Sequence, residues 1–239
     1  MRHLCALLLV LAACPAQGGD DYPVGPGGGS SGTNGGNRDA NDDDDAGDGG
    51  TLITGRVCLL DDLRQLASCS PNDISGLTVT LGTATAVTSN NGSFEIAAPA
   101  ATNVVWRVSG LNIVPSVMPF SPVARIPVIG DALYTDLLSG NSVLLQDGQG
   151  TLVAHLIHNN LAAVDATVTL DPPTANDTFY DGNDALRWDI DKAGSFGVTW
   201  LPGADVGTVE ITANLGTSQI TATYPIENQA ITFAEIEIP

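Results

Sequence analysis

From residue 51 onward the chain consists of short segments rich in Val, Thr and Ile, interrupted by Gly, Asn, Asp or Pro about every eight to twelve residues. This spacing is typical of an all-β sandwich or barrel. Helical periodicity is nearly absent. The one stretch that favours a short helix is DALYTDLLSG at 131–140, with Asp131 as its cap and Gly140 at its end. The pattern therefore predicts an all-β fold.

The same pattern occurs twice. TVTL stands at 78–81 and again at 167–170, and after each copy a turn leads into Gly-Ser-Phe, at 92–94 and 194–196. Chance can duplicate four residues, but it seldom duplicates a strand, a turn and a second strand in the same order. The repeat predicts two copies of one β unit.

Each Gly-Ser-Phe is expected to open an alternating strand, because apolar side chains follow at every second position. A first strand is expected before each TVTL, at 51–60 and 150–157, and a returning strand after each Gly-Ser-Phe strand, at 103–110 and 207–216. The side chains expected on the inner face are Phe94, Ile96 and Ala98 in the first copy, and Phe196, Val198 and Trp200 in the second.

Two units of about 90 residues each suit the usual size of a domain. We expect β-sandwich domains at 51–130 and 149–239, with a short connector, a possible helix, at 131–148. TSNNGSFEI in the first copy and DIDKAGSFGVTWLPG in the second resemble the signature of carboxypeptidase regulatory-like domains, which are small transthyretin-like sandwiches. This resemblance implies two tandem Ig-like or transthyretin-like β-sandwiches that act as structural or binding modules, without catalytic residues.

Residues 14–50 contain almost no large apolar side chain and are rich in Gly and Asp. Such a stretch cannot offset the entropy cost of folding, so we expect a disordered acidic linker. Residues 1–13 have a basic start, a short apolar run and small residues before Cys14, the pattern of an export signal. Leu11-Ala12-Ala13-Cys14 also resembles the bacterial lipobox, which implies a lipid on Cys14. An ordinary secretory signal with a chance cysteine is the alternative.

These features predict an extracytoplasmic protein of the bacterial cell envelope, held to the membrane by its N-terminal lipid. Pro15 follows Cys14 where an Asp would favour inner-membrane retention, so the outer membrane is favoured. The formal charge of −19 repels nucleic acid and excludes it as a partner. A surface protein or a polysaccharide is the expected partner class.

Cys58 and Cys69 are the cysteines that remain beyond Cys14, and an exported protein meets an oxidising environment. We expect a disulfide between them, with two free buried thiols as the alternative.

The second copy carries an insertion with six aspartates. Carboxylates that converge on one loop suit Ca²⁺, which takes oxygen ligands in loose geometry, whereas Asp is also a common turn residue. Calcium is the one possible cofactor, and the candidate ligands are Asp181, Asp184, Asp189 and Asp191. Tyr180 and Trp188 flank the same loop and could stack on a sugar ring or pack on the sandwich.

No catalytic constellation stands out. His155 and His158 would point to opposite faces of a strand, which is poor geometry for a shared metal. We therefore expect a non-enzymatic structural or adhesive surface module. The alternative is a calcium- or carbohydrate-binding surface protein that uses the 171–191 loop; exposure of Trp188 would favour that alternative, and burial would favour a scaffold.

Overall fold

The structure is a computed structural model that describes residues 51–70, 74–101, 103–122, 124–182 and 184–239. The expected signal, the lipidation site Cys14 and the acidic linker lie outside the described residues, so these expectations stay predictions.

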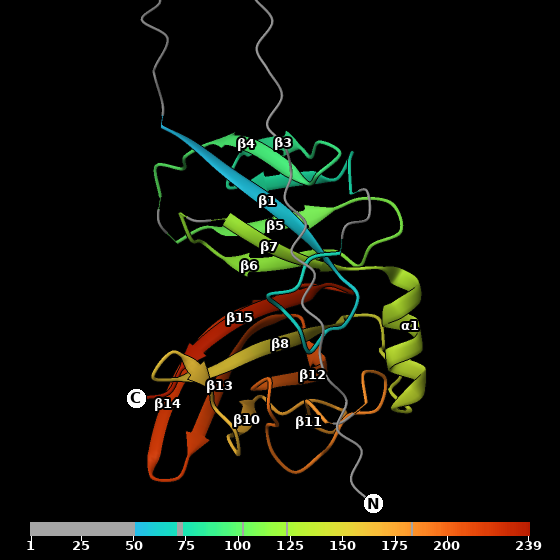
Figure 1. Cartoon of the computed structure of the whole chain (residues 1–239), viewed down its shortest axis with the longest axis vertical. Coiled ribbons are helices and arrows are strands. Elements are labelled where there is room, and N and C mark those ends of the chain that lie inside the picture. The colour runs from blue at the N-terminus through green and yellow to red at the C-terminus, as the bar shows by residue number, and fades with distance from the viewer. Residues whose placement is uncertain (1–50, 71–73, 102, 123, 183) are drawn as a thin grey trace, which may run out of the picture. The chain divides into compact units, whose positions relative to one another are not determined.

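The regular structure of the described residues is β-strand, as the sequence predicts, except for one helix between two groups of strands (Figure 1). The strands of the first group are β1 (Leu52–Leu60), β2 (Thr78–Leu81), β3 (Ala84–Val87), β4 (Ser93–Ala97), β5 (Val105–Ser109), β6 (Ser116–Pro119) and β7 (Ala124–Ile129). Helix α1 (Asp131–Gly140) follows. The second group comprises β8 (Gln149–His158), β9 (Leu161–Ala162), β10 (Thr167–Asp171), β11 (Phe179–Tyr180), β12 (Val198–Asp205), β13 (Gly207–Leu215), β14 (Ser218–Ile226) and β15 (Ile231–Glu237).

The sequence repeat is also a repeat of topology. In the first group, β1 lies between the Gly-Ser-Phe strand β4, which is antiparallel to it, and the last strand β7, which is parallel to it. In the second group, β8 lies in the same way between β12 and β15. The expected first strands are thus confirmed in both copies, and the structure adds their partners on either side.

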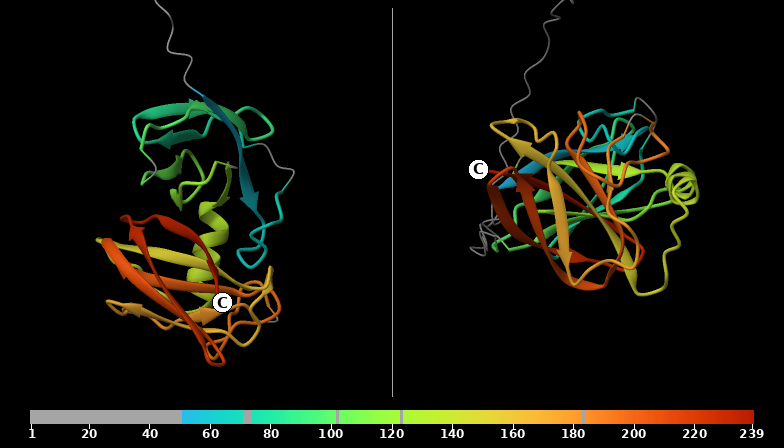
Figure 2. Two further views of the ribbon diagram at one scale, coloured as in Figure 1. Left: turned by 90° about the vertical axis from the view of Figure 1, so that its left-hand side faces the viewer. Right: turned by 90° about the horizontal axis from the view of Figure 1, so that it is seen from below.

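The second layer repeats as well. The TVTL strand β2 pairs with the returning strand β5, which pairs with β6. In the second group, β10 pairs with β13, which pairs with β14. Each group is therefore a β-sandwich of two layers, which we call the first and the second sandwich, and the expected fold class is confirmed (Figures 1 and 2).

Each sandwich has its own core, because alternate side chains of both layers point inward. Trp106 fills the first core, with Phe94 edge-on to it at 5.6 Å between ring centroids. The second core is filled mainly by aliphatic side chains, such as Leu152 and Ile211.

A third apolar cluster, which we call the interface core, takes residues from both sandwiches and from α1. Leu60 and Ile129 come from the first sandwich, Trp200 and Phe233 from the second, and Tyr134 from the helix. Strand β12 is buried on both faces for this reason: Leu201 belongs to the second core, whereas Val198 and Trp200 belong to the interface core.

One sheet also runs through both sandwiches. Strand β15 pairs in parallel with β6 through Ile231↔Ser116 and Thr232↔Val117, which joins β11-β12-β8-β15 to β6-β5-β2-β3. The two sandwiches therefore share main-chain hydrogen bonds in addition to the interface core.

Two local expectations are wrong. Phe196 does not lie on the inner face of a strand: it is 37% exposed, and β12 begins only at Val198. Gly197 has a φ of +65° and turns the chain between them, so the second Gly-Ser-Phe ends in a turn and not in a strand. Helix α1 spans the expected residues, but Asp131 is not its cap; Gly130 holds that position, without a side-chain hydrogen bond.

Candidate functional site

Asp181 is a structural carboxylate in the insertion of the second sandwich. It is buried, and its oxygens accept hydrogen bonds from the main-chain N–H groups of Gly194, Phe196 and Val198, at 3.0, 2.7 and 2.9 Å. Charged acceptors of this kind form strong hydrogen bonds. The side chain of Asp181 therefore fixes the turn that carries the second Gly-Ser-Phe.

The other candidate calcium ligands do not join Asp181. Asp184, Asp189 and Asp191 are exposed. One carboxylate oxygen of Asp184 accepts the N–H of Leu186 at 2.9 Å, the geometry of a local turn. Within the described ranges, no group of three or more His, Cys, Asp or Glu side chains could hold a metal ion.

Tyr180 and Trp188 are core residues. The Tyr180 hydroxyl accepts the N–H of Val168 at 2.9 Å inside the second core. Trp188 is 7% exposed, lies edge-on to Trp200 with ring centroids 5.7 Å apart, and donates its indole N–H to the carbonyl oxygen of Ala185 at 3.3 Å. Both rings pack in the protein, so the stacking interpretation does not hold and the structure favours the packing alternative.

Cys58 and Cys69 form the expected disulfide. Cys58 is fully buried in the interface core, and Cys69 packs against it. The guanidinium of Arg125 contacts the sulfur of Cys69 at 3.0 Å and donates a hydrogen bond to the carbonyl oxygen of Ala67. The disulfide and Arg125 thus hold the 58–69 loop closed at the end of β1.

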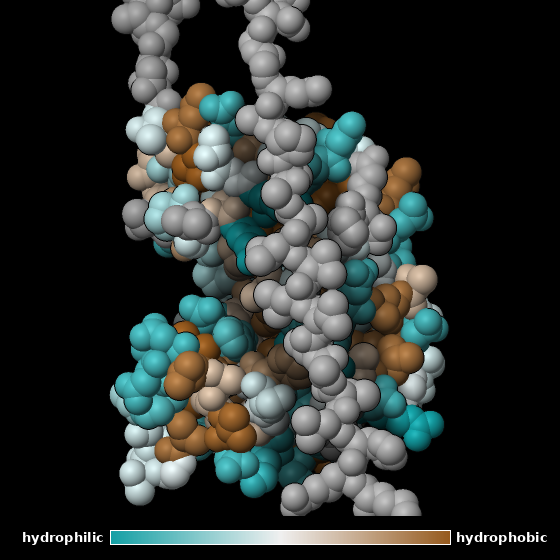
Figure 3. Space-filling model, in the orientation of Figure 1, coloured by the Kyte–Doolittle hydropathy of each residue, from teal (hydrophilic) through white to brown (hydrophobic). Residues whose placement is uncertain are grey.

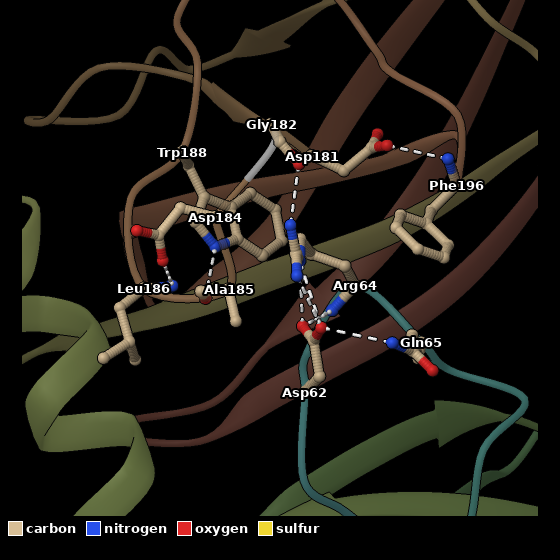
Figure 4. A network of polar contacts seen from close by, with 10 residues as sticks. All are labelled: Asp62, Arg64, Gln65, Asp181, Gly182, Asp184, Ala185, Leu186, Trp188 and Phe196. Carbon is tan, nitrogen blue, oxygen red and sulfur yellow. Dashed lines mark hydrogen bonds and ion pairs between the residues drawn. The ribbon is translucent and has the colours of Figure 1, made fainter. Parts of the chain in front are cut away.

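This disulfide loop reaches across to the second sandwich through Arg64 (Figure 4). The Arg64 guanidinium forms an ion pair with Asp62 at 2.8 Å and donates a hydrogen bond to the carbonyl oxygen of Gly182 at 2.7 Å. It also lies over the ring of Phe196, 5.5 Å from the centroid, a cation–π distance. The ring of Phe196, from the second Gly-Ser-Phe, therefore contacts the guanidinium of Arg64 from the first sandwich.

The charges of this contact reinforce one another. Burial by itself raises the pKa of the Asp62 carboxyl, but the hydrogen bonds and charge of Arg64 outweigh burial, and the pKa lies below its usual range. The same hydrogen bond raises the pKa of Arg64, and the carboxylates of Asp181 and Asp184 add to this effect. The carboxylates of the acidic insertion thus favour the positive charge of Arg64, which belongs to the first sandwich.

Asn141 makes a second polar contact to the insertion, from the end of α1. Its amide donates to the carbonyl oxygens of Leu137 at 2.8 Å and Leu186 at 2.9 Å. Its own side-chain oxygen accepts the N–H of Trp188 at 3.1 Å. One side chain thus ends the helix and fixes the loop that carries Trp188.

A groove remains open between the sandwiches, and the molecular surface is hollowed there (Figure 3). Its two connected parts have volumes of about 590 and 390 Å³. His155 lies in it, 3.5 Å from the carboxylate of Glu235. His158 is not part of the groove and bonds the carbonyl oxygen of Ile238 through Nδ1 at 2.8 Å. Residues that line both parts are Leu66, Arg125, His155 and Glu235.

Arg64 and Asn141 are the important residues that sequence reasoning missed. The chain has only 8 Lys and Arg against 27 Asp and Glu, so an arginine inside the predicted disulfide loop was a signal for a contact with an acidic segment. Asn after the last apolar residue of a helix is likewise a known signal for a helix end.

No protein-family model matches the chain, and no curated protein matches it in sequence. Among solved structures, it is similar to the minor pilin GBS52 of Streptococcus agalactiae, with 11% identity, a TM-score of 0.25, and coverage of 78% of this chain and 95% of the pilin. It is also similar to the Bacillus anthracis TIE protein, with 9% identity, a TM-score of 0.25, and coverage of 78% of this chain and 34% of that protein. Both TM-scores are low, and the function proposed below rests on the residues of the chain itself. None of the helical segments within the described ranges is long and apolar enough to span a membrane.

Proposed function

We propose that this protein is a non-enzymatic structural module of the bacterial cell envelope, in which two β-sandwiches form one stiff body carried on a lipid-anchored linker. One observation carries the proposal: the insertion that would have formed a ligand site instead fastens the two sandwiches to each other. Within this insertion, Asp181 fixes the turn that carries the second Gly-Ser-Phe, and Trp188 packs in the interface core. The carbonyl oxygen of Gly182 accepts the hydrogen bond from Arg64 of the first sandwich.

The contacts between the two sandwiches are numerous enough to support a stiff arrangement of the pair. The sandwiches share an apolar core, paired main chains at β15 and β6, and a polar contact from Arg64 to Gly182; the helix between them adds a contact from Asn141 to Leu186. A second polar contact between the sandwiches is the ion pair of Arg107 and Glu227, at 2.6 Å. Domains joined by a small polar interface move relative to each other, whereas a large apolar interface prevents such motion.

The proposal includes the resemblance to carboxypeptidase regulatory-like domains. The equivalent positions of the strand that contains or follows Gly-Ser-Phe, β4 beside β1 and β12 beside β8, support it. The proposed location in the cell envelope rests on the lipobox-like sequence Leu11-Ala12-Ala13-Cys14. Lipid on Cys14 would anchor the protein, since two or more acyl chains bind stably where one binds only marginally.

Stiffness is tested by measuring a distance between the sandwiches. Spin labels on cysteines introduced at Leu111 and Leu161, both strongly exposed and one in each sandwich, report that distance in the full chain. We expect one narrow distribution, and a broader one when Arg64→Ala is added. A broad distribution in the unaltered chain would refute a stiff module and would favour two independently moving binding domains.

Anchoring is tested separately by fractionating a bacterial host that expresses the full chain. We expect the protein in the membrane fraction, and Cys14→Ser in the soluble fraction. Cys5→Ser is the matched control, because Cys5 belongs to the segment that is removed. Equal distribution of the two variants would refute the lipid anchor without bearing on stiffness.

A further inference from the structure

Strand β14 is the outer strand of the sheet β10-β13-β14 in the second sandwich. Pro225 has no N–H, so its place in β14 is one that faces away from β13. Because facing alternates along a strand, Gln219, Thr221 and Thr223 direct their main-chain groups outward as well. Within the described residues, no hydrogen bond reaches these outward groups.

The two ends of β14 differ in how they are covered. At the Tyr224–Ile226 end, Thr232 donates a hydrogen bond to the carbonyl oxygen of Pro225 at 2.6 Å, and Tyr224 donates to that of Glu235 at 3.3 Å. Strand β15 thus closes this end. The open part of the edge runs from Ser218 to Thr223.

The open edge of β14 carries no charge, although the chain is very acidic. Residues 211–226 contain no Asp, Glu, Lys, Arg or His, although the chain carries a formal charge of −19. Natural edge strands are usually protected by charged side chains. A second copy of the chain is repelled by negative charge where acidic residues are exposed, and this uncharged strand adds no repulsion of its own.

The side chains of the open edge are also self-complementary. Thr212 and Thr221 already share a hydrogen bond between their hydroxyl oxygens at 3.0 Å, across the β13–β14 pair. If two copies of β14 pair in antiparallel with Thr221 at the centre, Thr221 faces Thr221 and Gln219 faces Thr223. Thr–Thr pairs of this kind stabilise a sheet.

The inner face fits the same arrangement. Ile220 and Ala222 are only partly buried at the rim of the second core. In the pairing centred on Thr221, Ile220 of one copy faces Ala222 of the other. Both apolar side chains would then leave water, which favours association.

We propose that this protein forms a symmetric dimer through antiparallel pairing of β14 with β14 of a second copy, which joins two three-stranded sheets into one of six strands. The contact is isologous, so it closes at two copies. This goes beyond the proposed structural role, because neither stiffness nor anchoring requires association.

The test is sedimentation equilibrium of the full chain in the Cys14→Ser background, where lipid does not drive association. We expect a dimer whose dissociation constant rises by at least about tenfold in Thr221→Glu, since like charges then face each other at the centre of the contact. Thr85→Glu is the matched control, because Thr85 is exposed on another edge strand, β3, and it should leave the dimer intact.

Covalent trapping tests the register. Opposite residues of an antiparallel pair lie about 5.5 Å apart at Cα when they are hydrogen bonded, a distance that a disulfide spans. Oxidised Thr221→Cys should give a covalent dimer on a non-reducing gel, and Thr85→Cys should not. A monomer at the highest soluble concentration, or a dimer that Thr221→Glu does not weaken, would overturn the proposal.

Discussion

The guanidinium of Arg64 and the carbonyl oxygen of Gly182 are 118 residues apart in the chain and 2.7 Å apart in space. The hydrogen bond between them joins the disulfide loop of the first sandwich to the insertion of the second. Arg64 also contacts Asp62 of its own loop and Phe196 of the second sandwich, so its side chain has partners in both sandwiches.

Removal of Arg64 should therefore destabilise the whole protein and not one sandwich. Arg64→Ala leaves Asp62 partly buried without its cation, and we expect a loss of about 2 to 3 kcal/mol in the free energy of unfolding. Arg64→Lys keeps the charge but not the forked geometry and should recover only part of it. Urea unfolding measures both, with exposed Arg187→Ala as the control; equal stability of Arg64→Ala and Arg187→Ala would contradict the assigned role.

Replacement of Asp181 should be costly even by its closest analogue. Asp181→Asn keeps the shape but turns one acceptor oxygen into an NH₂ group that meets main-chain donors, and we expect a loss of about 2 to 4 kcal/mol. Asp184→Asn is the matched control at an exposed position, where a change within about 0.5 kcal/mol is expected. Thermal or urea unfolding compares the two, and a similar loss in both variants would refute the structural assignment.

Calcium should leave the unfolding midpoint unchanged. A ligand that binds only the native state raises the midpoint. The oxygens of Asp181 already accept three main-chain hydrogen bonds, and Asp184, Asp189 and Asp191 do not converge on it. Calorimetry with Ca²⁺ and then with EDTA measures this. A rise with Ca²⁺ that Asp184→Ala abolishes would restore the calcium-site hypothesis.

Reduction of the Cys58–Cys69 disulfide should weaken the contact between the sandwiches. Opening a loop of this length costs about 3 kcal/mol on the chain-entropy model. It also frees the segment that positions Arg64. We expect a lower unfolding midpoint and new protease cleavage between residues 61 and 68 after reduction. The Cys58→Ser/Cys69→Ser double variant, which cannot form the disulfide, should behave like the reduced protein whether or not a reductant is present. Cleavage confined to other segments would contradict this.

Alkaline pH should act through Tyr134, which lies in the interface core with its hydroxyl 2.5 Å from that of Thr151. Burial raises the pKa of Tyr134 to about 12, above its ordinary value of 10. Between these values the unfolded chain loses the proton and the folded protein keeps it, so stability falls as pH rises above about 10, by at most about 3 kcal/mol. Tyr134→Phe should show a shallower decline in urea unfolding between pH 9 and about 12; an unchanged slope would exclude Tyr134 as the cause.

The fold could be predicted from the sequence better than the structural role of the 171–191 insertion could. Strands β1, β5, β8 and β13 fall where alternation and turn residues indicate, because these signals are local. The ends of helix α1 were predicted as well, although its cap was not. The disulfide followed from cysteine number and compartment alone.

The role of the aspartates could not be predicted in the same way. A buried Asp181 and an exposed Asp184 look alike in sequence, and only the approach of the Gly194–Val198 turn separates them. The burial of Trp188 depends on Trp200 and on a core shared by two sandwiches. Both features arise from contacts between distant segments, which no local pattern encodes.

The parallel pairing of first and last strands sets how each sandwich responds to tension. In the first sandwich β1 runs beside β7 from Gly55↔Ala124 to Leu60↔Ile129, and in the second β8 runs beside β15 from Thr151↔Ile231 to Ile157↔Glu237. A force that draws apart the ends of a sandwich acts along such strands, so their hydrogen bonds are loaded in shear and must break together. Rupture under load is governed by the unfolding rate, which this geometry slows. A chain held at its N-terminus and pulled from its far end would thus resist extension at two successive points.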